Sequence, residues 1–251
     1  MDPSFALRLG LLLVRPAALL AIAPPFGGSY TPAWVKIGMS VVLALFVAPT
    51  VSVPEVTGGA MLVVVVAREL MIGIALAMAV RVMLAGVELA GQLAGFQLGF
   101  AYAAAVDPQT GARNNLIATL YANLALFTFL AINAHHLLLR AFTQSYASVP
   151  IGLGGVDAGL GALVARTLGA IFLIGVQLAA PVVIVLLIVE LGLGLITRAA
   201  PALNMMIIGF PVRLLAGLIV LGATVSIVPA LTHGAVPTLL DLAARLARAF
   251  R

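Results

Sequence analysis

Long apolar runs with very few charged side chains are the feature of this sequence that most limits its possible folds. Apolar residues make up 63% of the 251 residues, whereas Asp, Glu, Lys and Arg together make up 8%. A typical soluble domain carries about a quarter charged residues. One water-soluble core of this length has too few charges to cover so much apolar surface. The solvent around the chain is therefore largely lipid, or lipid with other apolar chains, which excludes a cytosolic enzyme and a disordered or fibrous chain.

The few charged residues are scattered and do not form a surface for nucleic acid. Thirteen basic and eight acidic residues give a formal net charge of +5. The basic residues lie singly beside apolar runs, and no basic cluster precedes the last seven residues. This distribution suits membrane edges and buried ion pairs, not a strip that follows a phosphate backbone. The chain has no Cys, which excludes disulfides, thiol catalysis and Cys-based metal sites.

Because every face of the apolar runs is apolar, segment length and helix breakers delimit the helices. We predict apolar segments over 5–23, 33–53, 60–82, 83–106, 116–142, 163–197 and 205–231, a Gly- and Pro-bearing connection over 145–161 and a short amphipathic helix over 238–251. The third and fourth segments form either one long helix or a hairpin near Arg81. A helix of about 20 residues crosses the hydrocarbon of a bilayer. The sequence thus predicts an all-α fold of membrane-type helical hairpins with about six to seven apolar helices.

Several charged residues fall inside or at the ends of these segments, where we expect them to be buried and paired. An isolated charge at bilayer depth costs at least ~2.5–3.5 kcal/mol on insertion scales. The helices must therefore pair such charges within a protein interior, with Arg81 near Glu88 and Glu190 near Arg198 as the pairs considered. The candidates for buried charges are Arg68, Glu69, Glu88, Glu190, Arg198 and Arg213.

Three glycines spaced four residues apart predict a helix-packing face. Gly91, Gly95 and Gly99 line one side of the predicted helix with bare backbone, so that another helix can approach closely. The face serves ordinary packing within the chain, close packing against copies of a partner subunit, or both.

A polar interval over 107–115 is the most informative loop. Asp107 precedes Pro108, and Gly111 follows three residues later, a combination typical of a turn. The residues alone leave two interpretations open: an aqueous loop between two helices, or a mobile loop that lies in a cavity.

No pattern in the sequence indicates catalysis, a cofactor or a metal. His135 and His136 are adjacent, so on a helix they point about 100° apart and do not chelate one ion together. His233 stands alone, and the chain has no Gly-x-Ser-x-Gly, Walker, His-Glu-x-x-His or Gly-x-Gly-x-x-Gly motif. We therefore expect no catalytic residue, no metal and no cofactor.

Taken together, an ordered set of motifs resembles the FliR family, the flagellar members of the FliR/SctT export-gate proteins of bacterial type III secretion. The motifs cover almost the whole chain: Arg15-Pro16, Pro24-Pro25-Phe26-Gly27, Arg68–Gly73, Gly91–Phe100 running into Val106-Asp107-Pro108, His135-His136, Ala180-Pro181, Ile196–Asn204 and Ile208–Pro211. Each is weak alone, but the ordered set is specific.

The resemblance implies a subunit of the flagellar export gate in the bacterial inner membrane, at the flagellar basal body. It implies assembly with FliP and FliQ near FlhB and FlhA, and passage of unfolded flagellar proteins through the assembly. It also implies a single export-gate domain over 1–251, with a FliP-like portion over 1–161 followed by a FliQ-like helical pair within 162–251. The family's pore-occluding loop corresponds to a segment that contains Phe100, Tyr102, Val106, Asp107, Pro108, Gln109, Thr110 and Gly111.

Two other functions stay open at this point. The nearest is the homologous gate subunit of a virulence secretion system, the injectisome. From another class, a small-molecule membrane transporter would have a solute site among Glu88, Gln92 and Glu190.

Overall fold

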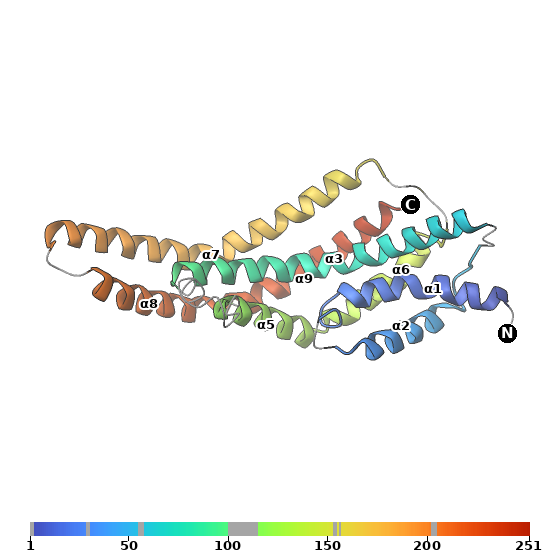
Figure 1. The fold of residues 1–251 in the computed structure, drawn as a ribbon, viewed down its shortest axis with the longest axis horizontal. Coiled ribbons are helices and arrows are strands. Elements are labelled where there is room, and N and C mark those ends of the chain that lie inside the picture. The colour runs from blue at the N-terminus through green and yellow to red at the C-terminus, as the bar shows by residue number, and fades with distance from the viewer. Residues whose placement is uncertain are drawn as a thin grey trace. The chain divides into compact units, whose positions relative to one another are not determined.

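The computed structural model describes residues 3–28, 31–54, 58–99, 115–152, 155, 157–201 and 205–251. These residues form α-helices and no strand (Figure 1), which confirms the predicted all-α fold. The helices are α1 (Pro3–Ile22), α2 (Ala33–Val47), α3 (Gly59–Gln97), α5 (Leu116–Ala131), α6 (Ala134–Ser148), α7 (Leu160–Ala199), α8 (Met205–Thr224) and α9 (Ile227–Arg248).

Several helix boundaries differ from those predicted. The segments predicted over 60–82 and 83–106 form the single 39-residue helix α3, so the hairpin near Arg81 is excluded. The segment predicted over 116–142 is instead divided between α5 and α6, because Asn133 adopts a left-handed backbone with φ 57°. Asn is one of the few residues that tolerate this conformation. As α6 continues to Ser148, the predicted connection over 145–161 begins later than expected.

The end of the chain also differs from the prediction. Helix α8 ends at Thr224, and α9 begins at Ile227, well before the short helix predicted over 238–251. Pro237, which directly precedes the predicted start, lies inside α9.

Helix length and composition identify the chain as a membrane protein. Within the described residues, five helices are long and apolar enough to cross a bilayer, or six if α5 and α6 together form one interrupted span. Helix α2, with 15 residues, is shorter than a span.

The described chain divides into two compact units that alternate along the sequence. Unit 1 comprises Met1–Val82, Leu130–Leu168 and Ala235–Arg251, and unit 2 comprises Met83–Phe129 and Gly169–Gly234. The division into 1–161 and 162–251 follows from the resemblance and stays a prediction.

In unit 1, α1 packs against α2, and the core is formed by apolar side chains of α1, α3 and α6. Fully buried examples are Leu11, Leu19, Ile72, Leu76 and Phe142.

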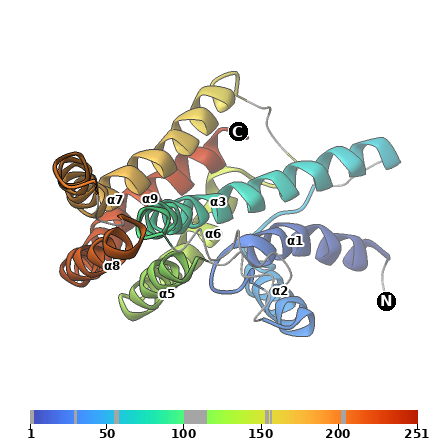
Figure 2. The same cartoon turned by 60° about the vertical axis from the view of Figure 1, so that its left-hand side comes forward.

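In unit 2, the part of α7 after Leu168 and the following helix α8 lie side by side as a hairpin, as both Figure 1 and Figure 2 show. Their apolar faces are largely uncovered. Only 28% of the most apolar window of α7 and 17% of that of α8 are buried. Exposed side chains on them include Phe172, Leu187, Leu191, Phe210 and Ile219.

Candidate functional site: a buried ion-pair cluster in unit 1 and glycine contacts in unit 2

A fully buried ion pair lies at the centre of unit 1. Arg15 of α1 and Glu69 of α3 have 0% and 1% of their side-chain surface exposed. The pair is bidentate: Nε of Arg15 donates to Oε2 of Glu69 at 2.8 Å, and Nη2 donates to Oε1 at 2.9 Å. This fork geometry is the strongest arrangement available to an arginine and a carboxylate.

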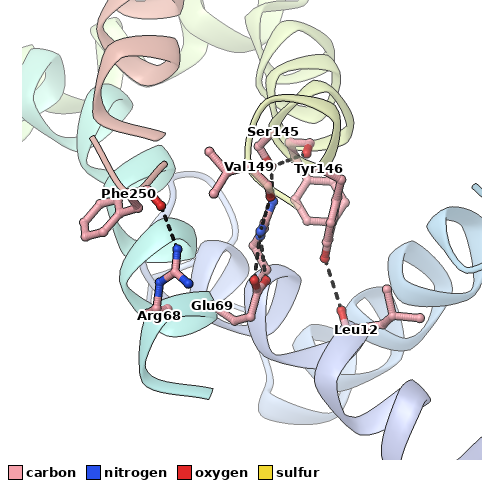
Figure 3. Close-up of polar contacts among 9 residues, drawn as sticks. Leu12, Arg68, Glu69, Ser145, Tyr146, Val149 and Phe250 are labelled. Carbon is pink, nitrogen blue, oxygen red and sulfur yellow. Dashed lines mark hydrogen bonds and ion pairs between the residues drawn. The ribbon is translucent and has the colours of Figure 1, made fainter. Parts of the chain in front are cut away.

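Helix α6 completes the cluster with an acceptor from its last turn and one from the residue after it. Nη1 of Arg15 donates to the Ser145 hydroxyl at 2.8 Å, and Nη2 also donates to the carbonyl oxygen of Val149 at 3.0 Å. The hydroxyl of Ser145 in turn donates to the carbonyl of Phe142 at 2.6 Å. Figure 3 shows Glu69 facing Ser145 and Val149, with Tyr146 beside them. The cluster thus ties α1, α3 and α6 together.

Tyr146 covers the cluster and uses a backbone acceptor that a proline has left free. The Arg15 guanidinium carbon lies 4.0 Å from the centroid of the Tyr146 ring, a cation–π distance. Pro16 lies inside α1 and has no N–H, so it cannot bond to the carbonyl of Leu12 four residues earlier. The Tyr146 hydroxyl donates to this Leu12 carbonyl at 3.4 Å (Figure 3). The sequence Arg15-Pro16 therefore supplies both a buried cation and an available acceptor.

A close approach of α1 and α3 holds the two charges within bonding distance. A Cβ at Gly73, one turn after Glu69, would lie 2.5 Å from the Arg15 carbonyl oxygen and 2.6 Å from the Ala18 Cβ. Only glycine fits here without a shift of backbone. The cluster has no group poised for chemistry: its charges neutralise each other, and its role is to fix the positions of three helices.

The neighbouring Arg68 points the other way, toward the end of the chain. Its Nη2 donates to the carbonyl oxygen of Phe250 at 2.8 Å (Figure 3). The backbone of residues 249 and 251 also accepts hydrogen bonds from the N–H groups of Asp157 and Gly155. Arg68 and Glu69 therefore connect α3 to two different parts of unit 1.

The remaining predicted charges lie nearer the surface. Glu190 forms an ion pair with Arg213, and about a third of each side chain is exposed. Arg198, which was considered beside Glu190, lies two turns further along α7 and is exposed. Glu88 is also exposed in the single chain, contrary to its place among the buried candidates, because it projects from an uncovered side of α3.

Arg15, the most buried charge, was not among the predicted candidates. The signal in the sequence was an arginine in the middle of an apolar helix, together with a glutamate inside another. Neither charge could be satisfied at bilayer depth without the other.

The three predicted packing glycines lie in unit 2. A Cβ at Gly91 would meet the Ala118 Cα at 2.5 Å, so α3 and α5 approach closely here. Gly95 faces the Asn115 side chain, which leaves no room for a Cβ. The Asn115 amide donates to the carbonyls of Gly91 and Gln92, and its oxygen accepts from the N–H of Ile117. Gly99 has φ 88° and ends the turn after α3.

The predicted pore loop lies outside the described residues. This applies to Phe100, Tyr102, Val106, Asp107, Pro108, Gln109, Thr110 and Gly111.

Metal-binding groups are not assembled in the described part of the chain. There, no three His, Cys, Asp or Glu side chains come close enough together to hold an ion. The ring centroids of His135 and His136 are 4.3 Å apart. The two rings are therefore adjacent, although residues next to each other on a helix point about 100° apart.

Comparison with known proteins relates most of the chain to bacterial export proteins. The family model for bacterial export proteins, family 1, matches residues 6–238. The flagellar biosynthetic protein FliR of Bacillus subtilis is 33% identical over 87% of this chain and 86% of its own length. The flagellar biosynthetic protein FliR of Pectobacterium carotovorum is 31% identical over 92% of this chain and 89% of its own length. The Yop proteins translocation protein T of Yersinia pestis is 27% identical over 68% of this chain and 67% of its own length.

The match extends over both compact units, and Arg15 and Glu69 lie within the matched residues. The chain therefore belongs to the FliR family of bacterial export proteins.

Proposed function

We propose that the chain is a subunit of the flagellar type III protein export gate, in the inner membrane at the flagellar basal body. It assembles with FliP and FliQ near FlhB and FlhA, and forms part of the channel for unfolded flagellar proteins. It acts as a structural component of this path and not as an enzyme. The observation that carries the proposal is membership of the FliR family over residues 6–238.

The surface of unit 2 supports assembly with other subunits. Helices α7 and α8 leave most of their apolar side chains uncovered in the single chain. Contiguous apolar patches of this kind mark contacts with lipid or with other chains. A hairpin of two long apolar helices also supports the proposed FliQ-like portion within 162–251.

A deletion strain tests this function directly. Cells that lack the native FliR protein should regain motility and secretion of hook protein when this chain is expressed, and FliP and FliQ should be recovered with it on purification. A chain that purified as a stable monomer and restored neither property would contradict the proposal.

The homologous subunit of a virulence secretion system is the second candidate. It is favoured by the relative from Yersinia pestis, at lower identity and coverage than the flagellar relatives from Bacillus subtilis and Pectobacterium carotovorum. Restoration of effector export in a needle-complex mutant, without restoration of motility in the flagellar mutant, would favour this second function. The transporter interpretation has less support, because Glu190 pairs with Arg213, while Glu88 and Gln92 are exposed on α3.

We further propose that the segment over 101–115 closes the export path at rest. Its sequence supports this role, because a turn-forming loop can yield without disrupting a packed helix. Deletion of Gln109–Arg113 should leave assembly and secretion intact but raise the ion conductance of the assembled complex. Normal assembly without additional leakage would show that the segment is a solvent-facing turn.

A further inference from the structure

A cleft with two arginines at its rim lies within unit 1, and Ser145, which accepts a hydrogen bond from Arg15 of the buried cluster, also lines it. It has a volume of about 280 Å³ and is bounded by α6, α9 and one residue of α3. Leu76 and Leu137 contribute apolar surface, and Arg140, Gln144, Ser148 and Arg248 contribute polar groups. Leu76 is fully buried, whereas Arg140, Gln144 and Arg248 are exposed. The cleft therefore combines an apolar floor with a polar, cationic rim.

Its two positive charges are not neutralised by the described part of unit 1. Neither guanidinium has an ion pair or hydrogen bond with a described residue. The side-chain carboxylates of the described residues in this unit are all engaged elsewhere: Glu69 with Arg15, Asp241 with Arg245 and Asp157 with the N–H of Gly159. The C-terminal end of α9 places a partial negative charge near Arg248, which offsets only a fraction of one charge. The rim keeps a net positive charge that favours an anion.

The two helices that form the cleft have the character of elements at a membrane surface. Among the described helices, α6 and α9 separate polar from apolar side chains most strongly and are the least apolar on average. An amphipathic helix lies at the level of the lipid headgroups, and the end of a spanning helix, where Ala247 and Arg248 lie in α9, reaches the same level. Basic pockets between helices at that level are sites for anionic headgroups.

We propose that the two-arginine cleft binds the phosphate group of an anionic phospholipid. A phosphate diester offers oxygens that two guanidiniums engage with paired hydrogen bonds, and Gln144 and Ser148 add neutral donors on the same face of α6. The apolar floor fits the glycerol and the first methylenes of a lipid. A free phosphate would gain nothing from Leu76 and Leu137. The proposal rests on the chain being a membrane protein, and not on its role in export.

The test uses the full-length chain, purified in a neutral detergent without phosphate. Dioleoylphosphatidylglycerol, zwitterionic dioleoylphosphatidylcholine and inorganic phosphate are added separately, and bound molecules are counted by native mass spectrometry over a concentration series. The test variant is Arg140→Gln/Arg248→Gln. The control is Arg166→Gln, which removes an exposed arginine of unit 1 outside the cleft.

Phosphatidylglycerol should bind the unaltered chain and the control equally, and more tightly than the other two molecules. Each arginine removed should weaken binding roughly tenfold, as expected for loss of a charge-assisted hydrogen bond. If the glutamine variant does not fold, Arg140→Lys/Arg248→Lys retains the charge but loses the paired geometry, and should also bind phosphatidylglycerol more weakly than the unaltered chain.

Three results would overturn the proposal. Undiminished binding of phosphatidylglycerol by the double variant would exclude the cleft. Equally tight binding of inorganic phosphate would assign the cleft to free phosphate and not to lipid. Normal lipid binding by the double variant, with loss of FliP and FliQ on purification, would show that the arginines pair with a carboxylate of another subunit.

Discussion

Replacement of Arg15 by methionine is the sharpest test of the buried cluster. The substitution keeps a side chain of similar length but leaves Glu69, 1% exposed, without its partner. It also removes donors from the Ser145 hydroxyl and the Val149 carbonyl. Breaking a buried ion pair by removal of one partner costs about 3–5 kcal/mol, because the other charge stays buried. We expect Arg15→Met to lower the free energy of unfolding by about this amount, a large part of a typical total stability of about 5–15 kcal/mol.

A double-mutant cycle separates the ion pair from the other contacts. In Arg15→Met/Glu69→Met both charges are absent, and the penalty of a lone buried charge disappears. The Val149 carbonyl still lacks its donor, which costs about 1–3 kcal/mol. The double variant should therefore be more stable than either single variant, with a large coupling energy between the two positions.

The assay is unfolding of the purified chain in mild detergent by a denaturant titration, followed by circular dichroism. The amount of protein in the membrane fraction reports folding in the cell. Two results would refute the reasoning that Arg15 and Glu69 form one fully desolvated pair. In the first, the losses in the free energy of unfolding of the two single variants add up in the double variant. In the second, each single variant loses less than about 1 kcal/mol of the free energy of unfolding.

Three further predictions concern the glycine contacts and the second ion pair. Gly73→Ala should force α1 away from α3 and destabilise the chain by about 1–3 kcal/mol, seen as a lower unfolding midpoint in the same titration; an unchanged midpoint would mean that the backbones separate freely. Gly95→Leu should displace the Asn115 side chain and reduce recovery of FliP and FliQ while membrane insertion is unchanged, and normal recovery would contradict this. Charge reversal at both Glu190 and Arg213 should change stability by no more than about 1 kcal/mol, because both side chains are about a third exposed; a much larger loss would indicate that other subunits bury the pair.

The class of fold could be predicted from the sequence because the composition alone excludes an aqueous environment around most of the chain. Helix positions followed from length and from breakers. Breakers are ambiguous, however, because a proline can lie inside a helix, as Pro237 does in α9, and because a residue other than glycine can adopt a left-handed backbone, as Asn133 does between α5 and α6. Local preference shows which residues tolerate such conformations, and packing determines whether they adopt them.

The partners of the charges were decided by tertiary structure. The sequence identified Glu69 as a charge in need of a partner, but Arg15 lies 54 residues away and Ser145 lies 130 residues from Arg15. Pairing over such separations depends on how closely α1 and α3 approach, which Gly73 permits. Similarly, Glu190 pairs with Arg213 of the facing helix α8 and not with Arg198 of its own helix. Composition determines that buried charges must be neutralised, whereas the packing of helices determines which charge meets which.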